Sequence, residues 1–130
     1  MILAGDVGGT KIHLALIADD GEPDHPSTEA RLRTADVREL PQAVAAFAQA
    51  SAGPIRAGVL GVAGPVMRGE IHGTNLPWSV SAAEMSRALG GAPVTLLNDL
   101  EAAAHGLDLL TPDEIEVLQE GRPQVDANRV

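Results

Sequence analysis

The stretch LAGDVGGTKIHLALI, residues Leu3–Ile17, decides the fold. Two apolar runs, Ile2–Val7 and Lys11–Ala18, lie on either side of the pair Gly8-Gly9. Short apolar runs joined by a glycine-rich turn are typical of a β-hairpin with buried strands. A carboxylate, Asp6, stands near the end of the first strand, beside the turn. The question is what function a charged side chain serves at the end of a buried strand.

Composition and charge narrow the possible functions. The chain has 130 residues, a length typical of one domain. With 18 acidic and 9 basic residues its net charge is −9, which argues against nonspecific binding of nucleic acid or of an anionic membrane. A nucleotide that carries a metal ion remains compatible with this charge. No cysteine is present, which excludes disulfides and thiolate chemistry and is compatible with the cytoplasm. No signal-peptide pattern and no apolar run long enough for a membrane span is found, so we expect a cytoplasmic protein.

The segments after the hairpin predict a third strand, a helix and a fourth strand. Residues Thr28–Thr34 alternate between apolar and charged side chains, as a half-exposed strand does. Asp36 and Glu39 resemble a capping box at the start of a helix that extends to about Ser51. The apolar run Arg56–Ala63 then predicts a buried strand.

The second half of the sequence continues the alternation of strands and helices. A small hairpin is expected in residues 66–73 with its turn at Arg68-Gly69, followed by a helix that Ser81 and Glu84 cap, a strand at Val94–Leu97 and a helix from Leu100 to Gly106. The first three long strands are tightly connected and should be antiparallel, whereas the last two follow crossover helices and should be parallel. We therefore predict an α/β fold with a mixed five-stranded sheet.

The glycine-rich turn is a candidate phosphate site. Backbone N–H groups of Gly8 and Gly9 could approach a phosphate closely, with the hydroxyl of Thr10 as a further donor. Asp6 could hold hydrated Mg²⁺, and Lys11 could reach a phosphate as a point charge. The alternative is an ordinary hairpin with a solvated aspartate and lysine.

A second candidate site follows the fifth strand. Asn98 and Asp99 come directly after it and open the last helix, and ligands of open α/β sheets bind at the carboxyl ends of strands. A carboxylate there could act as a general base toward a hydroxyl, and an asparagine amide could bind a sugar hydroxyl. The alternative is that either side chain merely caps the helix.

Two further patterns have structural alternatives. Asn75 lies in the polar segment GTNLPW, residues 73–78, which could contact a ligand or form a surface loop with Trp78 packed against the body. Gly58, Gly61 and Gly64 recur at every third position of the fourth strand, a pattern that we interpret as close packing of a helix.

Together these motifs resemble the bacterial glucokinase family, within the superfamily of sugar kinases, hexokinase and actin. The segment DVGGTK, residues 6–11, is similar to the superfamily's first phosphate motif. GVAGP, residues 61–65, and TNLPW, residues 74–78, resemble the family's sugar-side segment, and LNDLEA, residues 97–102, resembles the turn that bears its catalytic aspartate. The implied fold is the N-terminal lobe of a ribonuclease H-like, actin-like ATPase.

The resemblance implies a reaction and a role for each candidate residue. The reaction is ATP-dependent phosphorylation of the 6-hydroxyl of glucose, with ATP and Mg²⁺ as cofactors and Asp99 as the general base. By the same resemblance Asn98, Asp99 and Asn75 contact glucose. Asp6 lies near Mg²⁺. The ATP phosphates are contacted by Gly8, Gly9, Thr10 and Lys11.

The resemblance also predicts an incomplete protein. Residues 1–110 correspond to the small N-terminal lobe and residues 111–130 to a segment leading toward a second lobe. We expect little kinase activity from this chain alone, and a homodimer could form through the surface that the second lobe would cover. The alternative function is a non-catalytic sugar-binding or regulatory module related to the ROK group of repressors and kinases, whose turn commonly reads Gly-Gly-Thr-Lys as it does here.

Overall fold

A five-stranded sheet forms the centre of the molecule. The computed structural model describes residues 1–21, 25–72, 76–119 and 121. The strands are ordered β3-β2-β1-β4-β8 across the sheet. Their bounds are β1 Ile2–Val7, β2 Lys11–Ile17, β3 Thr28–Arg33, β4 Ala57–Val62 and β8 Val94–Asn98.

The pairing of the strands agrees with the sequence prediction. β1, β2 and β3 are antiparallel neighbours, whereas β4 pairs in parallel with both β1 and β8. Asp6 on β1 lies opposite His13 on β2 and Gly61 on β4. The predicted mixed α/β sheet is thus confirmed, and its parallel strands end on the side where the glycine-rich turn lies.

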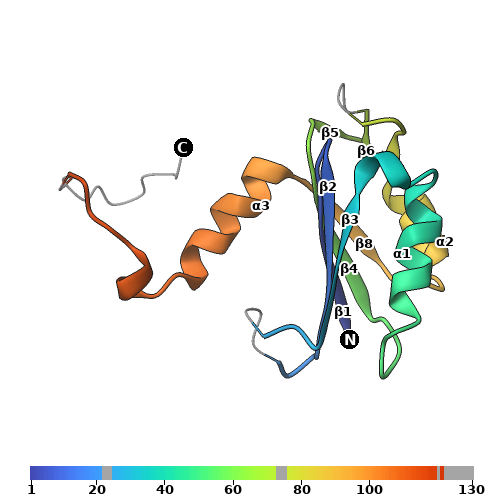
Figure 1. The fold of residues 1–130 in the computed structure, drawn as a ribbon, viewed down its shortest axis with the longest axis horizontal. Helices are drawn as coiled ribbons and strands as arrows, with labels where there is room; N and C mark the ends of the chain where they lie inside the picture. Colours follow the sequence, from blue (N-terminus) through green and yellow to red (C-terminus); the bar gives the residue numbers. More distant parts are fainter. Residues whose placement is uncertain (22–24, 73–75, 120, 122–130) are drawn as a thin grey trace.

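Helices cover the two faces of the sheet unequally (Figure 1). α1, Leu40–Ala48, and α2, Ala82–Ala88, lie together on one face, where they enclose the core. α3, Asp99–Gly106, leaves the other face and points away from the sheet, and it has no buried residue. The second face is therefore mostly open over the described residues.

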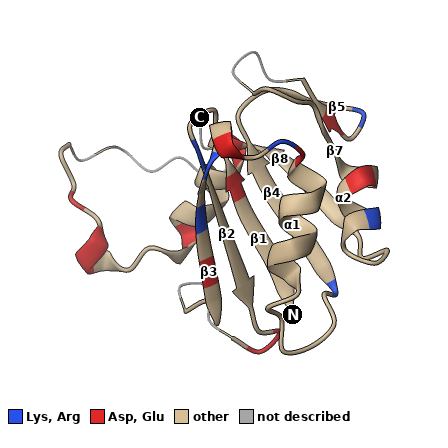
Figure 2. Ribbon diagram, turned by 45° about the vertical axis from the view of Figure 1, so that its right-hand side comes forward, with Lys and Arg blue, Asp and Glu red and all other residues tan. Residues whose placement is uncertain are grey.

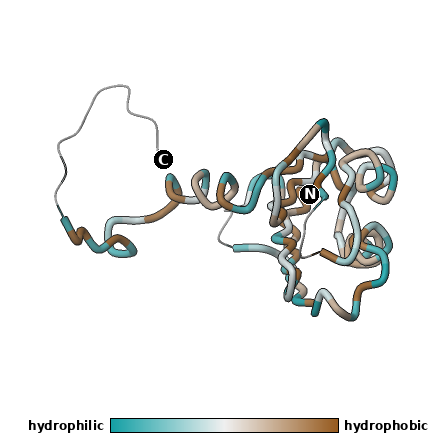
Figure 3. The backbone as a smooth tube through the Cα atoms, turned by 90° about the horizontal axis from the view of Figure 1, so that it is seen from above, coloured by the Kyte–Doolittle hydropathy of each residue, from teal (hydrophilic) through white to brown (hydrophobic). Residues whose placement is uncertain are grey.

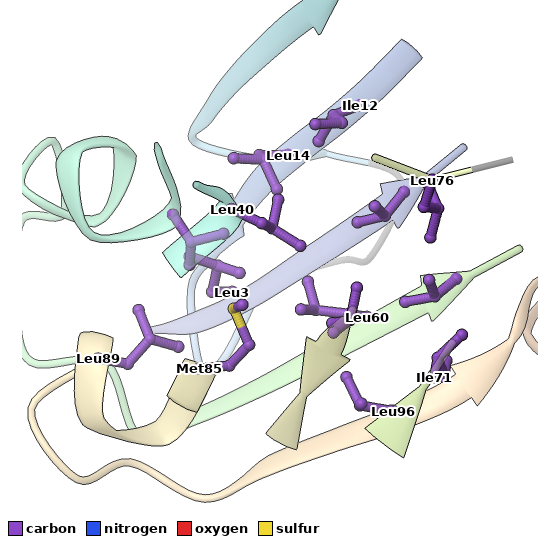
Figure 4. Close-up of a cluster of buried hydrophobic side chains, with 14 of the residues drawn as sticks. Leu3, Ile12, Leu14, Leu40, Leu60, Ile71, Leu76, Met85, Leu89 and Leu96 are labelled. Atoms are coloured by element: carbon purple, nitrogen blue, oxygen red, sulfur yellow. The ribbon is translucent and has the colours of Figure 1, made fainter. Parts of the chain in front are cut away.

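Aliphatic side chains fill the core between the sheet and the two helices (Figure 4). Because strand side chains alternate between faces, Leu14 and its neighbours two positions away all point to the same side. A fully buried leucine stabilises the fold by about 1.5–3 kcal/mol through burial alone. The residues that share this core with less than 2% exposure are Leu3, Val7, Ile12, Leu14, Leu16, Leu40, Val44, Leu60, Val62, Ile71, Val80 and Met85.

A small second sheet borders the main one. β5, Val66–Met67, pairs with β6, Glu70–Ile71, and β6 pairs with β7, Val80–Ser81, all antiparallel. Arg68 and Gly69 have φ angles of 54° and 77°, as a tight hairpin turn with two left-handed residues requires. The predicted small hairpin and its turn are confirmed.

Both predicted capping boxes are wrong. Asp36 ends a short 3₁₀ turn, Thr34–Asp36, and α1 begins only after Glu39, whose side chain makes no cap hydrogen bond. Pro41 in the first turn explains this start, because proline fixes a helical φ and needs no N–H partner there. Ser81 also makes no cap bond, since it is paired with Glu70 in the small sheet.

A capping box occurs instead where the sequence indicated only a turn. Thr111 and Glu114 form it around the 3₁₀ turn η3, Pro112–Glu114, with the Thr111 N–H donating to Glu114 Oε2 at 2.9 Å. Pro112 is compatible both with a simple turn and with the start of a helix. The hydrogen bonds between Thr111 and Glu114 show that the segment is a capped 3₁₀ turn.

The segment after α3 extends away from the body of the protein (Figure 3). It contains η2, Leu107–Leu109, and η3, and several of its apolar side chains are exposed. The proposed boundary near residue 110 therefore stays a prediction about a longer protein. Among the described residues, no helix is both long and apolar enough to cross a membrane.

Gly5 tests how tightly the core is packed. A Cβ at this position would lie 2.5 Å from Leu60 Cδ2 and 2.9 Å from Leu14 Cδ2. We expect Gly5→Ala to lower the free energy of unfolding by about 1–3 kcal/mol, because the core must shift to admit a methyl group. Urea unfolding measures this change. Gly53→Ala is the matched control, since nothing lies within 4 Å of its Cβ, and equal stabilities for the two variants would contradict the prediction.

Candidate functional site

One buried threonine, Thr34, binds the turn between β1 and β2 through two hydrogen bonds. The backbone N–H of Gly8 donates to Lys11 O at 2.9 Å and closes the turn. Thr34, which is 1% exposed, donates its hydroxyl to Gly8 O at 2.7 Å and its backbone N–H to Thr10 O at 3.0 Å. Both sides of the turn are therefore attached to the end of β3.

Sequence reasoning missed Thr34. The pattern predicts it only as the last residue of the third strand, where a threonine is an ordinary strand former. No sequence signal marks it, whereas the structure does, because Thr34 is the single buried polar residue among those that the structure describes. A buried hydroxyl needs a hydrogen-bond partner, and the turn supplies it.

The top of the turn is open to solvent. Gly9, Thr10 and Lys11 are exposed, and a Cβ on Gly8 would meet only Lys11 O at 3.3 Å. Gly8 and Gly9 do not have a positive φ, so the turn does not require glycine for its backbone conformation. Without side chains on Gly8 and Gly9 the turn can be approached closely, and the exposed backbone at Gly9 suits the binding of an anion, whereas the N–H of Gly8 is used within the turn.

Asp6 and Asp99 line one open hollow at the ends of three strands. Asp6 is exposed on the open face of β1, and Asp99 is half-buried at the start of α3. The hollow has a volume of about 390 Å³, and Gly61 lies between the two aspartates on β4. The structure thus brings together the two carboxylates that the sequence singled out.

Gly61 allows α3 to begin close to the sheet. A Cβ on Gly61 would lie 3.0 Å from the Cβ of Ala102 and 3.9 Å from the Cα of Asp99. A Cβ on Gly58 would meet Leu89 and Val94, each at 3.1 Å. The predicted close packing of a helix is confirmed at Gly61, where it also sets the position of Asp99. Gly58 is closely packed against the residue that follows α2 and against β8, whereas Gly64 is distinguished by its φ of 139°.

Asn98 uses both ends of its amide within the chain. Its Oδ1 accepts from the N–H of Leu100 at 3.0 Å and so caps α3, while its Nδ2 donates to Gly64 O at 2.9 Å. Gly64 has a φ of 139°, which L side chains rarely adopt. The helix-cap alternative for Asn98 is therefore confirmed, although its amide keeps one further N–H and one lone pair for a ligand.

Asp99 keeps one carboxylate oxygen free. Its Oδ1 accepts from the N–H of Leu100 at 3.0 Å, so two neighbouring side chains share this donor. In the described part of the chain, Oδ2 has no hydrogen-bond partner. A fixed carboxylate with one free oxygen can accept a proton from a hydroxyl placed in the hollow.

Asn75 lies outside the described residues, so its predicted contact with a sugar is a hypothesis. Its neighbour Trp78 donates its indole N–H to Val37 O at 3.0 Å. This bond attaches the end of the segment to the loop before α1, in agreement with the alternative in which Trp78 packs against the body.

The donor set at Asp6 suits a hydrated magnesium ion. No group of three metal-binding side chains occurs among the described residues. Mg²⁺ is commonly held by one or two carboxylates, the phosphates of a substrate and several waters. Asp6, exposed beside the turn, fits this mode of binding, whereas a site built from protein ligands alone does not fit here.

Comparisons with known proteins give the family of this chain and the similarity of its fold. A profile of the family described as Glucokinase matches residues 3–130. The glucokinase of Mesorhizobium japonicum is 36% identical over 99% of this chain, and that of Ralstonia nicotianae is 36% identical over 98%. The crystal structure of a glucokinase from an Antarctic psychrotroph superimposes with a TM-score of 0.78 at 26% identity, covering 95% of this chain and 39% of its own.

The fold and the site define an α/β lobe of the actin-like ATPase type, with a glycine-rich hairpin beside a strand-to-helix turn that carries an aspartate. The chain belongs to the glucokinase family. It spans 38% of the length of the curated relatives named above.

Thr34→Val tests the attachment of the turn. The substitution keeps the shape of the side chain but leaves Gly8 O without the hydroxyl, so we expect the free energy of unfolding to fall by about 1–2 kcal/mol. We also expect the amide protons of Gly8 and Thr34 to exchange faster, because both belong to this attachment. Urea unfolding and amide hydrogen exchange measure the two effects. Thr95→Val, at an exposed position on β8, is the control, and exchange rates at Gly8 that match those of the control would contradict the assignment.

Proposed function

We propose that this chain is the N-terminal part of a glucokinase that transfers a phosphoryl group from ATP to the 6-hydroxyl of glucose. The observation that carries the proposal is the hollow shared by Asp6 and Asp99, beside the open turn of the hairpin. In this proposal Asp99 faces the position of the sugar hydroxyl, and Asp6 lies next to the position of the ATP phosphates. The proposed location is the cytoplasm, where ATP is made and used.

In the proposed reaction Asp99 is the general base. Its free Oδ2 takes the proton of the 6-hydroxyl while the hydroxyl oxygen bonds to the γ-phosphorus, and the bond from that phosphorus to the leaving ADP oxygen breaks. Capping by Asn98 and packing at Gly61 hold Asp99 in place, so the base is oriented before the sugar arrives. Mg²⁺, when bound, neutralises phosphate charge, and Asp6 would hold it.

The glucose and phosphate contacts are proposed on the same residues. The spare N–H and lone pair of Asn98 can bind a sugar hydroxyl, and Asn75 is a second candidate. The exposed N–H groups of Gly9 and Thr10, with the ammonium of Lys11, are the proposed contacts of the ATP phosphates. The N–H of Gly8 already closes the turn, so Gly8 would contribute to this site by leaving room for the phosphates. Among the similar folds, a ROK family glucokinase from Streptomyces griseus was solved in complex with glucose and AMPPNP, with a TM-score of 0.65 at 24% identity.

Binding of both ligands to the chain tests the proposal. We expect glucose to shift the ¹H–¹⁵N NMR signals of Asn98, Asp99 and Leu100, and Mg-ATP to shift those of residues 8–11. Galactose should produce smaller shifts than glucose, because its 4-hydroxyl has the opposite configuration. The measurement needs ligand at tens of millimolar, since half of a two-lobed site binds weakly.

Two variants make the titration specific. Asp99→Asn should reduce the glucose shifts and leave the Mg-ATP shifts in place, because it removes the carboxylate and keeps the shape. Asp20→Asn, in the turn after β2 at the other end of the sheet, should change neither. A folded chain that shows no shifts with either ligand would contradict the proposed function.

The apolar surface beyond α3 has a proposed partner as well. Leu107, Leu109 and Leu118 are 51%, 63% and 89% exposed. These exposed apolar side chains, which we call the apolar patch, all belong to the segment of residues 107–118, and a concentration of exposed apolar residues is typical of an interaction surface. We propose that the further part of the protein covers it, and that two copies of the isolated chain associate through it.

Sedimentation velocity at rising concentration tests this association. We expect a concentration-dependent shift from monomer to dimer, which Leu109→Ser weakens because it removes apolar area from the patch. Met67→Ser is the control, since Met67 is 68% exposed on the small sheet, away from α3. A chain that remains monomeric at high concentration would refute the proposal.

A further inference from the structure

Three basic side chains gather at one end of the open face of the sheet. Lys11 lies directly opposite Arg33, and Arg31 lies directly opposite His13, in the pairing of β2 with β3. Ile12 and Leu14 point into the core, so these residues all point to the opposite face. Figure 2 shows basic positions on β3 and at the adjoining end of the sheet. We call Lys11, Arg31 and Arg33 the cationic strip.

The cationic strip is electrostatically unusual in this chain. Like charges directly opposite each other on a sheet destabilise it, and the chain as a whole has a net charge of −9. Lys11 and Arg31 form no ion pair with any described residue. Arg33 has one exposed contact, 3.9 Å from its Nε to Asp36 Oδ2, which contributes little to stability.

Protection of an edge strand does not explain this arrangement. Charged side chains on an edge such as β3 prevent pairing with other chains, and either sign of charge serves that purpose. The signs are separated here, because Glu29 lies further from the turn and contacts His13 at 3.4 Å. The positive charges are concentrated at the end of the strands that carries the candidate phosphate turn.

The cationic strip borders a hollow of its own. This hollow has a volume of about 380 Å³ and is lined by all three members of the strip together with Asp6, His13 and the flanking strand residues. The Nε2 atom of His13 lies 3.4 Å from Glu29 Oε2 but makes no hydrogen bond in the described part of the chain. Asp6 belongs to both hollows, so the second one continues from the candidate active site.

We infer that Arg31 and Arg33 of the cationic strip bind the phosphate chain of the phosphoryl donor and extend the contact already proposed for Lys11. Arginine suits this role because its planar guanidinium can bind two phosphate oxygens at once. This inference rests on the proposed function for the identity of the donor, but its chemistry requires only a chain of linked phosphates. Both ATP and inorganic polyphosphate carry such a chain.

Calorimetric titration of the chain with inorganic tripolyphosphate and with Mg-ATP tests the inference. We expect Arg31→Gln to weaken binding of each ligand about three- to tenfold, as loss of a charge-assisted contact does. Arg87→Gln on α2 removes the same charge far from the strip and should leave both affinities unchanged. AMP, which has one phosphate, should bind wild type and Arg31→Gln equally.

The outcomes separate this inference from the proposed function. Equal weakening by Arg31→Gln and Arg87→Gln, or no binding of tripolyphosphate to wild type, would overturn the cationic strip as a site. Weakening that is confined to Mg-ATP would also overturn it, since the phosphate chain alone would then not be recognised. Binding of tripolyphosphate through Arg31 without any glucose shift at Asp99 would support the strip and count against the kinase.

A third variant keeps the test decisive if Arg31→Gln fails to fold. Arg31→Lys retains the charge and loses the two-oxygen contact, so we expect a smaller loss of affinity than Arg31→Gln would cause. Unchanged affinity of Arg31→Lys for tripolyphosphate together with unchanged affinity of Arg33→Gln would overturn the inference.

Discussion

The alternation of side chains along β1 and β2 is the constraint on which the rest of the structure depends. Leu3, Ile12 and Leu14 are fully buried against α1 and α2, so every second residue is sent to the opposite face. A shift of the pairing by one residue would expose this core, which strongly favours a single register. The same alternation that buries leucines therefore places Asp6 and His13 on the open face, where a ligand can reach them.

The residues of the candidate site are held by hydrogen bonds and close packing, and a ligand can reach them from solvent. Asn98 and Gly61 set the start of α3, and Thr34 holds the turn, so Asp99 and the exposed N–H groups are presented by fixed elements. The groups proposed to face the phosphates and the hydroxyl come from β1 and α3, with β4 between them. The proposed transfer needs this separation, because each bound group must be held by its own part of the site.

The sequence predicted the long strands and their directions, because burial imposes a period of two and glycine marks the turns. It also found both carboxylates of the site, since polar residues at the ends of buried strands stand out. It could not place the helix starts: Asp36 and Ser81 matched the capping pattern, yet Pro41 and a strand pairing with Glu70 decided the geometry. The sequence also did not predict the role of Thr34 or the cationic strip, because both depend on contacts between residues that are distant in the sequence.

The bond between Trp78 and Val37 has a spectroscopic consequence. The chain has one tryptophan and no tyrosine, so its near-ultraviolet emission comes almost entirely from a single indole. That indole is attached to the loop before α1, and Trp78 follows Asn75 by three positions in the sequence. The protein thus carries a native fluorophore at a defined place, and its emission reports on one contact between two loops without any added label.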